Sequence, residues 1–170
     1  MEERKNIVLF VDDEPHVLSA IRRAVADEAY ISEFVGSGCE ALQIMDQRYV
    51  SVIVTDMRMP GMDGLTLLKI VREKYPGTVR MVLSGYTQLS QVLATVNQGD
   101  IFQFISKPWQ MEEELLVSVR QAIDRFNLEK ERDSLQEGLA QKNQAYLQIF
   151  RSMEQKLINE KRDLVSLKHI

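Results

Sequence analysis

Five short apolar runs alternate with segments of helical periodicity, and this alternation constrains the fold more than any other feature of the chain. The runs cover residues 7–11, 30–35, 51–55, 79–83 and 101–105. Three of them are almost continuously apolar, as expected for parallel strands that helices cover on both faces. Five strand–helix units predict a doubly wound α/β domain with a five-stranded parallel sheet, which we place at residues 1–126.

The segments between the runs carry helix signals. Pro15 opens the first expected helix, Ser37 can cap the second, Asp63 can cap the third, and Gly99 follows the fourth. Apolar residues recur at helical spacing in the first and third segments: Val17, Ile21, Ala24 and Val25, then Leu65, Leu68 and Val71.

A single long helix is predicted from residue 111 onward, because no strand or strong helix breaker appears there. The residues suited to docking its first part on the sheet are Leu115, Leu116, Val119, Ile123 and Phe126. The remainder, residues 127–170, forms a second region of the chain.

Residues 127–170 have a heptad pattern with interruptions. Leu128, Leu135 and Ile149 share one phase, and Leu139, Tyr146 and Met153 hold the partner position. Arg132 and Lys142 interrupt this seam, and Leu157, Leu164 and Leu167 resume it one residue out of phase. Gly138 costs roughly 1 kcal/mol against Ala in a helix. We predict a parallel coiled coil that makes the protein a homodimer; the alternative is a helical linker ordered only beside an output domain.

Composition excludes several classes of protein. The net charge of −4 gives no general attraction to nucleic acid or to an anionic membrane, and the tail has no helix-turn-helix pattern or basic stripe. The single cysteine, Cys39, cannot form an intramolecular disulfide. The apolar run 7–11 is too short for a signal peptide or a membrane span, so we expect a cytoplasmic protein.

Polar residues gather where the expected strands end. Asp12 and Asp13 follow the first run, Asp56 follows the third, and Ser84 and Lys107 come at the ends of the fourth and fifth strands. In a doubly wound sheet, the carboxyl ends of the strands form the usual site. Three converging carboxylates need a cation to offset their repulsion, and Mg²⁺ prefers such oxygen ligands.

This set of residues suits phosphoryl transfer. Asp56 would be the nucleophile and would form an acyl phosphate. The metal and Lys107 would neutralise charge on the phosphoryl oxygens, and Ser84 would hydrogen-bond one of them. Each residue alone has another interpretation: Asp12 and Asp13 could cap a helix, Asp56 could be a turn residue, and Lys107 could belong to an ordinary loop.

Several motifs, in order along residues 5–126, resemble the response-regulator receiver family, whose members have a CheY-like, flavodoxin-like fold. They are Val-Asp-Asp-Glu-Pro (11–15), Ser-Gly-Cys-Glu-Ala-Leu (37–42), Val-Thr-Asp-Met-Arg-Met-Pro-Gly-Met-Asp-Gly (54–64), Leu-Ser-Gly (83–85) and Lys-Pro-Trp (107–109). The resemblance implies phosphorylation of Asp56 by a histidine kinase. It also implies a Mg²⁺ site made of Asp12, Asp13, Asp56 and the backbone carbonyl of Arg58.

The resemblance further implies a conformational switch formed by Ser84 and Phe104. Phe104 stands where the family often has a tyrosine, and Ser84 stands where threonine is commoner. Phe104 can still turn inward, but it has no hydroxyl with which to bind a partner.

Two outputs are open. In one, the coiled coil passes the phosphorylation state to an output domain beyond residue 170, which could be an enzyme. In the other, the chain is a complete regulator that binds a partner protein when phosphorylated. In neither case do we expect the chain itself to be an enzyme, because it would turn over only its own acyl phosphate.

Overall fold

The computed structural model describes residues 5–85, 101–107 and 112–167, without the side chains of residues 112 and 164–167. Gly99, which the sequence places after a fourth helix, lies outside the described residues. By contact, the chain divides into two compact units, Met1–Glu129 and Lys130–Ile170.

The first unit is built on a five-stranded parallel sheet, as predicted. The strands are β1 (Ile7–Val11), β2 (Ile31–Val35), β3 (Val52–Thr55), β4 (Val79–Gly85) and β5 (Gln103–Lys107). They lie in the order β2-β1-β3-β4-β5, and every neighbouring pair is parallel. Because the chain moves from β1 to β2 at one edge and then back to β3, the topological switch point lies between β1 and β3.

Helices follow the strands where the sequence signals predict them. They are α1 (Pro15–Ala24), α2 (Gly38–Gln47), α3 (Gly64–Lys74) and α5 (Glu112–Leu167). The Ser37 hydroxyl accepts a hydrogen bond from the backbone N–H of Glu40 at 3.3 Å, and the Asp63 carboxylate accepts one from that of Thr66 at 2.7 Å. Both predicted caps are thereby confirmed, as is Pro15 at the start of α1.

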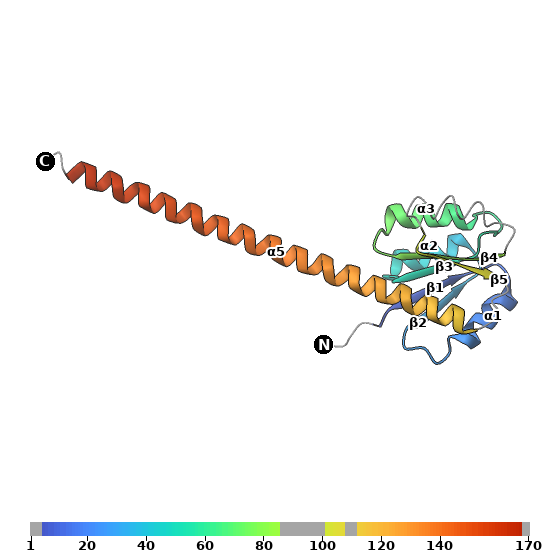
Figure 1. Cartoon of the computed structure of the whole chain (residues 1–170). Helices are drawn as coiled ribbons and strands as arrows, with labels where there is room; N and C mark the ends of the chain where they lie inside the picture. The colour runs from blue at the N-terminus through green and yellow to red at the C-terminus, as the bar shows by residue number, and fades with distance from the viewer. Residues whose placement is uncertain (1–4, 86–100, 108–111, 168–170) are drawn as a thin grey trace. The chain divides into compact units, whose positions relative to one another are not determined.

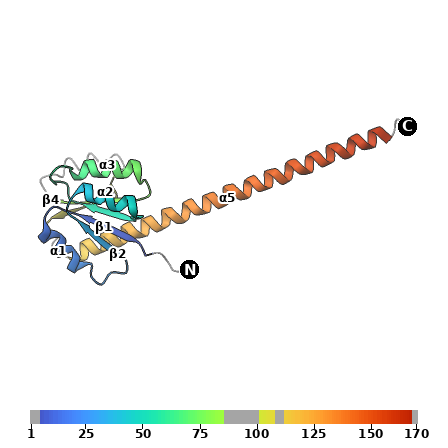
Figure 2. The ribbon, with the colours of Figure 1, turned by 180° about the vertical axis from the view of Figure 1, so that it is seen from behind.

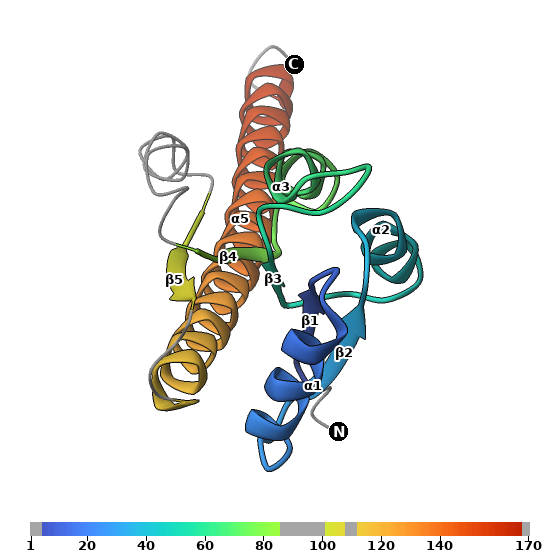
Figure 3. The same cartoon turned by 90° about the vertical axis from the view of Figure 1, so that its right-hand side faces the viewer.

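Alternate side chains of the strands enter two cores, one on each face of the sheet. Val8 and Phe10 of β1 belong to the core under α1 and α5, whereas Leu9 and Val11 belong to the core under α2 and α3. Figure 1 shows α2 and α3 on one side of the sheet and α1 with the start of α5 on the other. The views from behind and from the side show the same two layers (Figures 2 and 3).

The fifth strand begins and ends two residues later than the apolar run 101–105 indicates. Ile101 is buried but precedes the strand, and Ser106 and Lys107 pair in register with Ser84 and Gly85 of β4. The difference arises because backbone pairing with β4, and not hydrophobicity, sets the limits of β5. Lys107 is consequently held on a strand, which fixes its backbone at the edge of the sheet.

The long helix α5 changes character along its length. Leu115, Val119, Ala122 and Phe126 are buried against the sheet, and Leu116 and Ile123 are partly buried. From Leu128 onward the large apolar side chains of the described tail are exposed. Among the described residues, no helix is long and apolar enough to cross a membrane.

The cap of α3 gives a test of the fold. We expect Asp63→Ala to lower the free energy of unfolding by about 1 kcal/mol, because the N–H of Thr66 loses its acceptor. The hydrogen bonds from the backbone and side chain of Thr66 lower the pKa of Asp63 below its ordinary value of 3.8. The stabilisation is therefore complete above that pH and is lost as the pH falls below it.

Urea denaturation at pH 7 and at pH 3 measures both effects. Asp63→Asn is the matched control, since it keeps the acceptor but cannot titrate. A similar loss of stability in the Ala and Asn variants at pH 7 would contradict the capping role.

Candidate functional site

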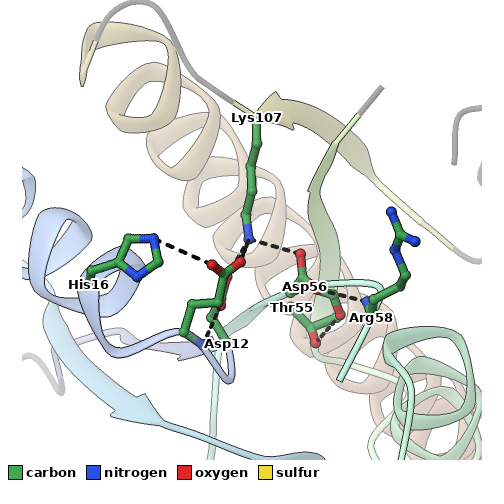
Figure 4. A network of polar contacts seen from close by, with 7 residues as sticks. Asp12, His16, Thr55, Asp56, Arg58 and Lys107 are labelled. Atoms are coloured by element: carbon green, nitrogen blue, oxygen red, sulfur yellow. Dashed lines mark hydrogen bonds and ion pairs between the residues drawn. The ribbon is translucent and has the colours of Figure 1, made fainter. Parts of the chain in front are cut away.

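The ends of three strands meet at one ion-paired cluster. Asp12 directly follows β1, Asp56 directly follows β3, and Lys107 is the last residue of β5. The Nζ atom of Lys107 lies 2.6 Å from Oδ2 of Asp12 and 2.9 Å from Oδ1 of Asp56. Figure 4 shows the lysine side chain reaching between the two carboxylates. Two of the predicted acids and the predicted lysine are thus within hydrogen-bond distance.

Backbone N–H groups hold the other carboxylate oxygens. Oδ1 of Asp12 accepts a hydrogen bond from the N–H of Glu14 at 2.9 Å, and Oδ2 of Asp56 accepts one from the N–H of Arg58 at 2.7 Å (Figure 4). The backbones of the acids are also fixed, since the N–H of Asp12 donates to Val35 and that of Asp56 donates to Val11. Both carboxylates therefore have defined orientations.

Burial makes the electrostatics of the cluster strong. The side chains of Asp12, Asp56 and Lys107 are 2%, 10% and 17% exposed. Burial raises the pKa of Asp12, and the hydrogen bonds from Lys107 and Glu14 offset this only in part. Burial alone would lower the pKa of Lys107, but its hydrogen bonds to Asp12 and Asp56 outweigh that effect and raise the pKa, so the ammonium is charged at neutral pH.

The remaining residues of the predicted metal site lie at the surface. Asp13 and the side chain of Arg58 are exposed. Across 5–85, 101–107 and the described part of α5, no group of three or more acidic, histidine or cysteine side chains is close enough together to bind a metal ion. The three predicted acids therefore do not form one cluster; the Lys107 ammonium lies between Asp12 and Asp56 instead.

The charge balance and donor atoms nevertheless fit a hard divalent cation. Two buried carboxylates share one ammonium, which leaves an excess of negative charge, and Asp13 adds a third carboxylate next to Asp12 in the chain. All the available ligand atoms are oxygens, as Mg²⁺ requires.

Ser84 and Phe104, the two predicted switch residues, point to the same face of the sheet. Ser84 is buried at the end of β4, two residues after Val82, and Val82 is in register with Phe104 of β5. Side chains two apart on a strand share a face. Val82 and Phe104 both belong to the core under α2 and α3, so Ser84 faces that side as well.

Gly64 and Glu14 are two contributors to the site that the sequence analysis missed. A Cβ atom at Gly64 would lie 2.1 Å from the backbone carbonyl oxygen of Asp56, so only glycine lets α3 approach this loop. One carboxylate oxygen of Glu14 lies 3.9 Å from Lys107 Nζ, and the other lies 3.4 Å from Nε2 of His16. Gly64 belongs to the sequence motif at residues 54–64, but the order of residues in that motif does not reveal that its backbone lies against that of Asp56.

Comparison with known proteins agrees with this geometry. The family model of the response regulator receiver domain matches residues 8–120 of this chain. The hydrogenase transcriptional regulatory protein HoxA of Cupriavidus necator is 42% identical over 129 residues, which cover 76% of this chain and 26% of that protein.

Two solved structures are also similar. The signal receiver domain of an HD domain-containing protein from Pseudomonas fluorescens is 32% identical, with a TM-score of 0.72 over 78% of this chain and 96% of that one. A structure of adenylate cyclase from Rhodopirellula baltica is 30% identical, with a TM-score of 0.73 over 78% of this chain and 97% of that one.

This chain belongs to the response regulator receiver domain family and therefore to phosphorylation-based two-component signalling. Receiver domains of this type are phosphorylated by histidine kinases and are linked to output domains. The chain spans about a quarter of the length of the curated relatives that it matches.

The close approach at Gly64 gives a second test. We expect Gly64→Ala to destabilise the first unit by about 1–3 kcal/mol, because the added methyl group must displace the backbone of Asp56. Gly36→Ala is the matched control, since a Cβ there meets no atom within 4 Å. Urea denaturation of both variants measures the difference, and equal stabilities would rule out the steric role of Gly64.

Proposed function

We propose that this protein is a phosphorylation-dependent switch in which Asp56 accepts a phosphoryl group from a histidine kinase. The observation that carries the proposal is the Lys107 ammonium, which lies within hydrogen-bond distance of both Asp12 and Asp56 at the edge of the sheet. A buried carboxylate without such partners would give no indication of a nucleophile. A carboxylate oriented by a lysine and by a backbone N–H is a prepared nucleophile.

Asp56 has the geometry that transfer needs. One carboxylate oxygen attacks the phosphorus atom, and an acyl phosphate bond forms as the bond to the phosphodonor breaks and its electron pair leaves with the donor. The hydrogen bond from the N–H of Arg58 limits rotation of the carboxylate. Lys107 then neutralises charge on the transferred group, because its ammonium is already beside Asp56.

Asp12, Asp13, Asp56 and the backbone carbonyl of Arg58 would hold Mg²⁺. The ion would neutralise negative charge on the phosphoryl oxygens while the phosphoryl group is transferred. This chain's part is to supply the oxygen ligands and the excess negative charge that attracts the ion. Asp12 and Asp56 are already held next to each other by Lys107.

The switch would run through Ser84 and Phe104. Ser84 would donate a hydrogen bond to the phosphoryl group and move toward it, and Phe104 on the same face would turn into the space that opens. A change of packing at β4 and β5 then biases the state of the domain. Since Phe104 has no hydroxyl, it would contribute to the switch only through packing of its ring and not through a hydrogen bond.

The phosphorylation state would pass to an output through α5, whose first turns are buried against the sheet. We propose that the tail pairs with that of a second copy, because its large apolar side chains are exposed in the single chain, and that this homodimer relays the signal in the cytoplasm. The matched region covers only 26% of HoxA from Cupriavidus necator, which supports an output domain elsewhere in the whole protein. The alternative is a regulator that acts by binding a partner protein when it is phosphorylated.

Intact-mass measurement after incubation with acetyl phosphate and Mg²⁺ tests the phosphoacceptor directly. We expect one added phosphoryl group in the wild type, and none in Asp56→Asn or in a metal-free sample. Asp13→Ala should lower the extent of modification without abolishing it, because Asp12, Asp56 and the backbone carbonyl of Arg58 remain to hold the metal ion. An adduct that persists in Asp56→Asn would refute the assignment of the site.

A further inference from the structure

The centre of the tail differs from its two flanks in charge. Between Gly138 and Phe150 the only charged residue is Lys142, whereas residues 129–133 are all charged and charges return from Arg151 onward. A solvated single helix is normally polar and charged along its whole outer surface. The centre of the tail therefore has the composition of a buried surface, although it is exposed in the single chain.

Large apolar side chains fill this low-charge segment and the turn after it. Those with exposed side chains are Leu139, Tyr146, Leu147, Ile149, Phe150, Met153 and Leu157. Tyr146 and Phe150 are 69% and 64% exposed. Depletion of charge together with enrichment of aromatic residues and methionine is the signature of the core of a protein interface.

The spacing places one stripe of these residues along the helix. Tyr146, Phe150, Met153 and Leu157 follow one another at intervals of four, three and four, so they share one face. Ile149 borders that face. Ala145 and Ser152, which are small, lie on the same side of the stripe as Ile149 and form the border opposite Phe150 and Leu157.

The two borders of the stripe are complementary to each other when two copies run in the same direction. In a parallel, in-register pair, each residue on one border lies opposite the residue five positions later on the partner. Phe150 then lies opposite Ala145 of the second copy, and Leu157 lies opposite Ser152. Large residues meet small ones on both sides of the seam, and no like charges meet at these positions.

An antiparallel pair would lack this match. It would bring the two borders with large side chains together on one side and the two borders with small side chains together on the other. The large side chains would overcrowd one side of the seam, and the small ones would leave a gap on the other. The distribution of large and small residues thus favours pairing of the tail with a second copy of this chain, with the two helices running in the same direction.

We infer that the tail segment from Gly138 to Leu157 is the core of a parallel, in-register interface between two copies, in which Phe150 packs over Ala145 of the partner copy. This inference rests on the homodimer of the proposed function and specifies its interface. Lys142 and Lys156 interrupt the seam within this segment, and the heptads before it, with Arg132 in the seam, contribute less to the pairing.

Disulfide trapping in the full chain tests the direction and register. Cys39 is exposed and is the only cysteine, so Cys39→Ser provides the background. In that background we expect Tyr146→Cys and Met153→Cys each to form a disulfide-linked dimer under mild oxidation, because each faces itself across a parallel seam. Gln148→Cys, on the outer face, is the control and should remain mostly unlinked.

The mixture of the Tyr146→Cys and Met153→Cys chains separates the alternatives. In a parallel pair the two positions are offset by about 10 Å, too far for a disulfide between unlike chains. Linkage between unlike chains that exceeds self-linkage would indicate antiparallel pairing and overturn the inference. Equal linkage at Gln148 would overturn it as well, because collision and not an interface would then explain the product.

Two substitutions of alanine by glutamate, one at the interface and one on the outer face, test the packing itself. Ala145→Glu places a carboxylate against Phe150 of the partner copy, and we expect dimerisation to weaken about tenfold or more by analytical ultracentrifugation. Ala140→Glu makes the same change on the outer face and should leave the dimer unchanged. Equal effects would refute the interface.

Intact mass after acetyl phosphate treatment is measured on the same variants. Failure of the trapping with normal phosphorylation counts against the interface alone. Loss of phosphorylation at Asp56 with normal trapping counts against the phosphoacceptor assignment alone.

Discussion

The Lys107 ammonium, shared between the carboxylates of Asp12 and Asp56, is the interaction on which the site depends. The sheet order makes it necessary: Asp12 and Asp56 follow neighbouring strands, whereas Lys107 comes from β5 and must reach past β4. A lysine suits this position because its long flexible stem carries a compact charge across that distance. Removing it would leave two buried carboxylates side by side, which folded proteins rarely tolerate.

The same interaction leaves the site incompletely neutralised. One ammonium faces two buried acids, and burial raises the pKa of Asp12 despite its hydrogen bonds. Stability alone would favour an equal number of charges or an apolar cluster. An excess of negative charge beside an oriented carboxylate instead favours binding of a divalent ion and a phosphoryl group. Around it, the capped and closely packed start of α3 holds the backbone of Asp56 in place.

Sequence patterns predicted the sheet, most helix starts and the residues that gather at the strand ends, because hydrophobic alternation and capping residues act locally. The later start and end of β5 could not be predicted, since pairing with β4 sets them. The lysine between two acids, the N–H of Arg58 on Asp56 and the contact at Gly64 also escaped prediction. The lysine contacts join strand ends far apart in sequence. The other two depend on the backbone conformation between Asp56 and Gly64, and a motif records which residues are present but not which atoms meet.

A crystal structure with Mg²⁺ and beryllofluoride, which imitates a phosphoryl group on a carboxylate, would show whether Asp56 is the phosphoacceptor. We expect the adduct on Asp56, with Lys107 Nζ moved from Asp12 to a fluorine atom and the metal ion held by Asp12. It would be contradicted by an unmodified Asp56 with Lys107 Nζ still between the two carboxylates. That result would make the cluster a structural ion pair and not a phosphoacceptor site.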